Sequence, residues 1–132
     1  MITGWSQEIV FSAEAIRQNV PSSSGIYEII QSTEYPRYRG KTRILKIGCS
    51  RSDLQAELLN HLRRHTAANR LARIQRSPGI TLSFKYAILG PEVVQDDEKA
   101  LLRSFEDEHW DLPLLNSTRG YDRDEDRHYR ED

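Results

Sequence analysis

Two short stretches that read as β-strands lie on either side of a turn-rich segment, and this arrangement constrains the fold most strongly. Ile26–Ser32 alternates and is rich in β-branched residues, and Arg43–Cys49 has a similar strand-like character. The segment between them, Thr33–Thr42, contains Pro36 and Gly40 and is predicted to be a loop. Because a short connection favours antiparallel neighbours, we expect the two strands to pair in this way.

The rest of the chain adds a third strand and several helices. The apolar residues of Ile80–Leu89 recur at every second position, which predicts a strand. Helices are expected over Phe11–Asn19 with Ser12 as cap, from Ser52 or Asp53 through residue 65, over residues 66–75 after a possible break near Thr66, and over Val93–His109. The expected fold class is therefore α+β, with a three-stranded antiparallel sheet flanked by helices.

Length and composition indicate one modest domain. The chain has 132 residues, of which 37% are hydrophobic and 30% charged. We expect a single domain over residues 1–120, followed by a charged and flexible tail over 121–132 that has almost no apolar content. No apolar run approaches a membrane span, and the N-terminus lacks the pattern of a signal peptide. With Cys49 as its one cysteine, the chain is expected to be cytoplasmic and to have no membrane partner.

Charge is distributed unevenly along the chain. Residues 37–76 contain eleven Lys or Arg and two acidic residues, whereas residues 91–132 contain six basic and fourteen acidic residues. A basic segment suits phosphate binding, because cations replace the counterions condensed on nucleic acid. The alternative is that folding places the acidic half beside the basic half and cancels the field.

Five short motifs occur in one order along the chain. Gly25-Ile26-Tyr27 opens the first strand and Lys46-Ile47-Gly48 lies in the second. They are followed by His61 in LLNHL, Glu98 in EKALLRSF and Asn116 in PLLN. In this order and on these elements, the motifs resemble those of the GIY-YIG nuclease family over about residues 12–116.

The resemblance implies a fold like that family's and a metal-dependent endonuclease that hydrolyses phosphodiester bonds of double-stranded or branched DNA. In the family, the tyrosine corresponding to Tyr27 activates or positions a water, and the glutamate corresponding to Glu98 binds a divalent cation, Mg or Mn. One carboxylate with water and phosphate oxygens is a suitable ligand set for such an ion. A phenol can act as a base only if a cation lowers its pKa, and Lys46 is a candidate for that cation.

Two departures from the family pattern concern the phosphate site. Lys46 replaces the usual tyrosine of the second motif, and Glu57 stands four residues before His61, where the family has a catalytic arginine. Arg64, on a similar helix face, or Arg51, after the second strand, could serve instead. In another alignment, His65 takes the histidine role and His61 the place of the arginine. The sequence leaves these alternatives open.

Further candidates concern DNA contacts and the backbone. Gly25 and Gly48 are expected to be structural, Gly48 either as a bend or as a place of close approach. Asn116 is a candidate DNA contact, although asparagine also commonly fixes a turn. The arginines expected to contact the DNA backbone are Arg63, Arg70, Arg73 and Arg76.

Two other functions compete with the nuclease. One is a DNA-binding module of the same fold without turnover, and the other is a protein-interaction domain that uses its acidic C-terminal part. A nuclease of this size would choose its target through a partner protein, a homodimer or a preferred DNA structure.

Overall fold

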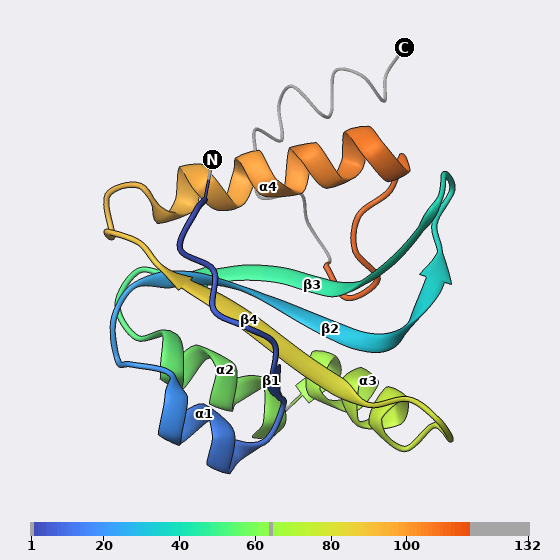
Figure 1. Cartoon of the computed structure of the whole chain (residues 1–132), viewed down its shortest axis with the longest axis horizontal. Helices are drawn as coiled ribbons and strands as arrows, with labels where there is room; N and C mark the ends of the chain where they lie inside the picture. Colours follow the sequence, from blue (N-terminus) through green and yellow to red (C-terminus); the bar gives the residue numbers. More distant parts are fainter. Residues whose placement is uncertain (1, 64, 117–132) are drawn as a thin grey trace.

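The protein folds as a sheet between two layers of helices (Figure 1). The computed structural model describes residues 2–63 and 65–116, with residues 63 and 65–69 described by their backbone alone. The elements in chain order are β1 Ile9–Val10, α1 Ala13–Asn19, β2 Gly25–Pro36, β3 Lys41–Ser50, α2 Leu54–Arg63, α3 His65–Gln75, β4 Leu82–Ile88 and α4 Val94–His109.

The α+β class and the antiparallel sheet are confirmed, but the sheet has four strands, in the order β1-β4-β2-β3, where three were predicted. The additional strand, β1, consists of Ile9 and Val10, which pair with Phe84 and Ser83. Two residues are too few to show an alternating pattern, so the sequence carried no signal for this strand.

Helices cover both faces of the sheet, as Figure 1 shows, with α4 on one side and α1, α2 and α3 on the other. The central strand β2 is therefore buried from Gly25 to Gln31. Tyr27 and Ile29 pack in the core on the side of α1 and α2, whereas Ile26 packs with Val94 on the side of α4. Alternation along β2 thus distributes side chains between two cores.

The β2–β3 hairpin is longer than predicted. The segment Thr33–Thr42 was expected to be a loop, but β2 continues to Pro36 and β3 begins at Lys41, with Tyr35 paired to Thr42. Strand pairing therefore extends the ladder past residues whose local preference is for turns. Only residues 37–40 connect the two strands, and Gly40 adopts a φ of 73°, which glycine tolerates readily.

The helix starts agree with the predicted caps. The Ser12 hydroxyl accepts a hydrogen bond from Ala15 N at 3.1 Å, and the Asp53 carboxylate accepts one from Ala56 N at 3.0 Å. Thr66, near which a break was predicted, lies within α3; α2 ends at Arg63 and α3 begins at His65, with residue 64 outside the described residues. The predicted tail, residues 121–132, lies outside the described residues.

Candidate functional site

The Tyr27 side chain is the centre of a buried polar network. Its relative exposure is 0%, yet its hydroxyl donates a hydrogen bond to Glu57 Oε2 at 2.8 Å and lies 2.7 Å from His61 Nε2. Glu57 and His61 are one helical turn apart on α2, with 3.5 Å between Nε2 and Oε2. A phenol has one proton, so if the hydroxyl donates to Glu57, His61 Nε2–H donates to the phenol oxygen.

A glycine on the neighbouring strand makes room for this phenol. Tyr27 pairs with Gly48 in the β2–β3 ladder, and a Cβ on Gly48 would lie 2.5 Å from Cζ of Tyr27. Close approach by a side chain was one of the two roles expected for Gly48. Gly25 also has a packing role, because a Cβ there would lie 2.5 Å from the backbone oxygen of Ala87.

Lys46 lies beside this network, on the edge strand β3. It pairs with Ile29, two residues from Tyr27, and therefore shares the α2 face of the sheet. Burial lowers the pKa of the Lys46 ammonium, and the nearby carboxylates of Glu57 and Glu98 oppose that shift. One half-buried cation thus interacts with two acidic side chains from different helices.

Glu98 reaches β3 from α4. It accepts a hydrogen bond from the Cys49 thiol, and Cys49 packs on the α4 side of the sheet. Burial raises the pKa of the Glu98 carboxyl, while the hydrogen bond from Cys49 and the charge of Lys46 act in the opposite direction. Burial, together with the neighbouring Glu98 carboxylate, raises the pKa of Cys49 to about 12.

Tyr27 does not have the environment of an activated base. The expectation was that a cation would lower the pKa of its phenol, but burial and the Glu57 carboxylate raise that pKa well above 10.0. Glu57, which faces the phenol, stands where the resemblance to the GIY-YIG family implies an arginine. The phenol is therefore held protonated, as a hydrogen-bond donor to Glu57.

Glu57 was missed as a functional residue, because the sequence pattern suggested only a lost arginine. The pKa of its carboxyl is lowered, chiefly by the hydrogen bond with His61 and also by that from Tyr27 and the charge of Lys46, although burial opposes the shift. The available signal was its i, i+4 spacing to His61 on one helix face. Glu57 is thus an ionised carboxylate within the network.

The predicted arginines lie outside this network or cannot be placed. Arg51 is exposed but close enough to Cys49 for its charge to favour the thiolate. Arg70 donates to the backbone oxygen of Leu114 at 3.3 Å, and Arg73 and Arg76 are exposed on and after α3. Arg64 lies outside the described residues, and the side chains of Arg63 and His65 are also outside them.

Asn116 binds the protein backbone. Its amide accepts a hydrogen bond from Ile47 N and donates one to Ile47 O, both at 2.9 Å. Leu115 N adds a bond to Leu45 O at 2.8 Å. The chain after α4 therefore closes the outer edge of β3 beside the candidate site.

The donor set is compatible with a hard divalent cation held by few protein ligands. Among the described residues there is no group of three or more His, Cys, Asp or Glu side chains that could hold a metal ion. The half-buried Glu98 carboxylate could supply one oxygen ligand, since Mg²⁺ commonly takes only one or two carboxylates together with water and phosphate oxygens. Glu98 thus fits the ligand role that the family resemblance implies.

Comparisons with known proteins gave no match to protein-family models, to curated proteins or to solved structures. In the described part of the chain, none of the helices has the length and apolar character needed to cross a membrane.

Proposed function

We propose that this protein is a divalent-metal-dependent DNA endonuclease with a GIY-YIG-like site and a fold of that family's kind. The observation that carries the proposal is the hydrogen-bonded set of Tyr27, Glu57 and His61, which lies within electrostatic reach of Lys46 and Glu98. Of the motif residues, Tyr27, Lys46 and His61 lie on the α2 side of the sheet, whereas Glu98 approaches the edge strand β3 from the α4 side and acts on the others through its charge.

Each side chain has a role that follows from its exposure and charge. Lys46 and the exposed Arg51 supply positive charge for an anionic phosphodiester. Glu57 and His61 have side-chain exposures of 35% and 13%, so they can contact a water that the sealed Tyr27 cannot. Tyr27 is then a positioning residue, whose hydroxyl fixes Glu57 and His61 while one of these accepts the proton of the attacking water.

Glu98 would hold Mg or Mn through its carboxylate. Such an ion, when bound, supplies Lewis-acid stabilisation of the charge that develops on the phosphoryl oxygens. Binding would also favour the ionised form of Glu98, whose pKa burial raises. The role of Glu98 itself is to present one anionic oxygen within electrostatic reach of Lys46.

The test is nicking of supercoiled plasmid in Mn²⁺ or Mg²⁺ by the full chain. We expect Glu98→Gln and Glu57→Gln to lower the nicking rate at least about 100-fold, the scale of a lost acid–base or charge-stabilising group. Asp107→Asn, at an exposed position of the same helix α4, is the matched control and should keep the full rate. Nicking that survives both site substitutions would identify a contaminant and overturn the proposal.

A DNA-binding module without turnover is the second candidate, and the Glu57 carboxylate favours it. An anion hydrogen-bonded to Tyr27 repels a phosphodiester at the position where the family has a cation. In this case, Glu57→Gln should strengthen DNA binding by about fivefold, the effect of one unit charge at about 4 Å in water. Salt-dependent binding without nicking in any metal would establish this alternative.

A further inference from the structure

Two aromatic side chains from distant parts of the sequence stack at the molecular surface. Tyr38 lies in the turn between β2 and β3, and Trp110 directly follows α4. Their ring centroids are 5.5 Å apart with an interplanar angle of 21°, and the two residues remain 79% and 59% exposed. Large aromatic side chains at such exposure contribute little to the core, so their placement calls for another explanation.

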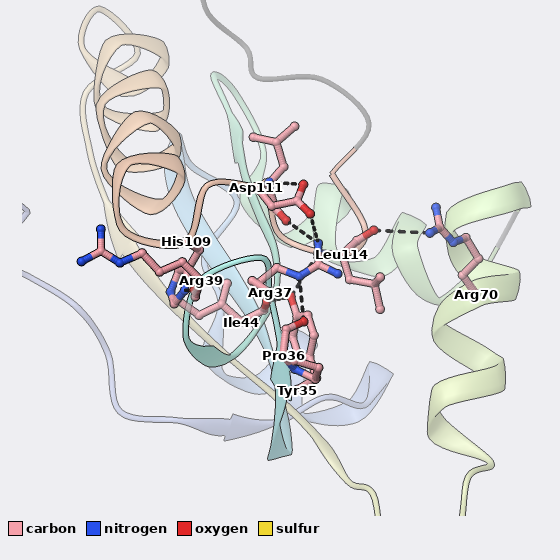
Figure 2. Close-up of polar contacts among 10 residues, drawn as sticks. Tyr35, Pro36, Arg37, Arg39, Ile44, Arg70, His109, Asp111 and Leu114 are labelled. Atoms are coloured by element: carbon pink, nitrogen blue, oxygen red, sulfur yellow. Dashed lines mark hydrogen bonds and ion pairs between the residues drawn. The ribbon is translucent and has the colours of Figure 1, made fainter.

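The pair is held in place by a network of hydrogen bonds, part of which Figure 2 shows. Arg39 N donates to His109 O at 3.0 Å, and His109 Nδ1 lies 2.8 Å from Arg39 O. Arg37 contacts Asp111 Oδ2 at 3.1 Å and Leu112 O at 2.9 Å. These contacts fix the hairpin turn against the end of α4.

Trp110 itself has an unusual backbone. With a φ of 59°, it is the one non-glycine residue with positive φ in the described part of the chain. Its N–H bonds to Glu106 O at 2.7 Å and ends the helix. Helices usually make this turn with glycine, so the chain retains an indole at a position that disfavours it.

Cations accompany the two rings. The Arg39 guanidinium lies 5.6 Å from the Trp110 ring centroid and extends outward in Figure 2. A hollow of about 320 Å³ adjoins it and is lined by Arg39, Gly40, Lys41, Glu108 and His109. Its acidic residue, Glu108, lies 3.0 Å from His109 Nε2. The exposed cations Arg39 and Lys41 therefore outnumber the acidic side chain in the lining.

We propose that Tyr38 and Trp110 form a stacking platform for unpaired bases of a DNA strand, with Arg39 and Lys41 beside the strand's phosphates. Exposed aromatic rings next to cations are the elements that bind single strands, because every base has a π-face. A base in a duplex already has its faces covered by its neighbours, so the platform distinguishes unpaired from paired DNA.

The platform and Glu98, the candidate metal ligand, lie along one helix. Glu98 is twelve residues before Trp110, a separation of roughly 18 Å along the axis of α4. At about 3.4 Å per nucleotide, a strand at duplex spacing covers this distance in about five nucleotides. The choice of DNA as the partner rests on the proposed function, and the platform would direct that function to DNA with a single-stranded segment.

The first experiment uses tryptophan fluorescence. The chain has two tryptophans, so Trp5→Phe leaves Trp110 as the sole indole reporter. A single-stranded 15-nucleotide DNA should quench Trp110 fluorescence saturably, whereas a blunt duplex of the same sequence should quench it far less. Absence of quenching by single strands, or equal quenching by both DNAs, would overturn the proposal.

The second experiment tests the ring of Tyr38 by fluorescence anisotropy with a labelled single strand. Tyr38→Ala should weaken binding at least about fivefold, the lower range for loss of one stacked aromatic, and Tyr38→Phe should leave it nearly unchanged. Val10→Ala, which trims an exposed apolar side chain on β1, is the control for lost apolar surface. Equal affinity of Tyr38→Ala and the parent protein would overturn the platform.

These measurements distinguish a failure of the stacking platform from a failure of the proposed nuclease function. If plasmid nicking fails while Tyr38-dependent binding of single strands persists, the proposed function fails and the platform stands. If metal-dependent nicking is intact and Tyr38→Ala binds single strands normally, the platform fails and the nuclease stands.

Discussion

Gly48 lies directly opposite Tyr27 across the β2–β3 ladder, and the absence of a side chain at Gly48 lets the phenol pass over β3 to meet α2. This pairing links the first and second sequence motifs physically. Tyr27, two residues after Gly25, and Gly48, two residues after Lys46, therefore form one packing arrangement.

Gly48→Ala should therefore destabilise the protein and displace the Tyr27 hydroxyl. The added Cβ would lie 2.5 Å from Cζ of Tyr27, and overpacking of this kind costs about 1–3 kcal/mol. Urea unfolding measures the loss, and nicking assays measure the effect on the site. Gly4→Ala is the control, because a Cβ there meets nothing within 4 Å and should leave stability unchanged.

Tyr27→Phe should abolish most of the nicking activity without altering the shape of its pH profile below pH 10. The phenol is buried beside Glu57, and its pKa lies well above 10.0, so it does not ionise in the working range. Loss of its hydrogen bonds frees Glu57 and His61 to adopt other positions. A tyrosine-like inflection below pH 9 in the parent enzyme, absent from the variant, would contradict this interpretation.

The secondary structure could largely be predicted from the sequence because its signals are local. Alternation marked β2 and β4, the strand-like stretch Arg43–Cys49 marked β3, and the caps Ser12 and Asp53 marked two helix starts. The strand β1 could not be found, because its two residues are ordered only by pairing with β4. Long-range pairing, which no short window contains, also extended the hairpin through Tyr35 and Pro36.

The candidate site could be predicted only in part for the same reason. Motif order brought Tyr27, Lys46, His61 and Glu98 together as candidates, but the roles of Glu57 and Cys49 depend on which side chains meet in space. The stacking of Tyr38 on Trp110 was also beyond the sequence, because the two residues belong to separate elements.

Cys49 should react slowly with iodoacetamide in the folded protein. Raising the thiol pKa from 9.0 to about 12 lowers the thiolate fraction. The thiolate of a thiol with a higher pKa is intrinsically more nucleophilic, which offsets part of the loss of thiolate. We therefore expect Cys49 in the folded protein to react roughly 50-fold more slowly than in the urea-unfolded chain at pH 8. Glu98→Gln removes a neighbouring anion and should speed labelling, whereas Asp107→Asn should not. Equal rates in all three folded proteins, measured by mass spectrometry in EDTA, would place Glu98 away from the thiol.

Asn116→Ala should reduce stability and leave DNA affinity unchanged. The substitution leaves the N–H and carbonyl of Ile47 without their amide partner, which costs about 1–3 kcal/mol. Asn60→Ala, at an exposed position of α2, should cost almost nothing. Weaker DNA binding by Asn116→Ala at unchanged stability would instead restore the direct DNA contact that the sequence suggested.

Glu57 and Glu28 should contribute to the pH dependence of folding with opposite signs. The pKa of Glu57 is lowered by its hydrogen bonds with His61 and Tyr27, so its contribution is present above pH 4.5 and is lost as pH falls through the folded-state pKa. Burial raises the pKa of Glu28, with the Lys85 ammonium 3.4 Å away opposing the shift. Its stabilising contribution is therefore present below pH 4.5 and is lost as pH rises through the folded-state pKa.

Urea unfolding from pH 3 to pH 8 separates the two cases. As pH rises, the free energy of unfolding of the parent protein should increase relative to that of Glu57→Gln. Over the same range, the free energy of unfolding of the parent protein should decrease relative to that of Glu28→Gln. Because both substitutions replace a carboxylate with an amide of similar size, a general effect of charge removal would move both differences in one direction. If the difference between the parent protein and Glu57→Gln does not widen as pH rises, the hydrogen bonds from His61 and Tyr27 do not hold Glu57 ionised in the folded state.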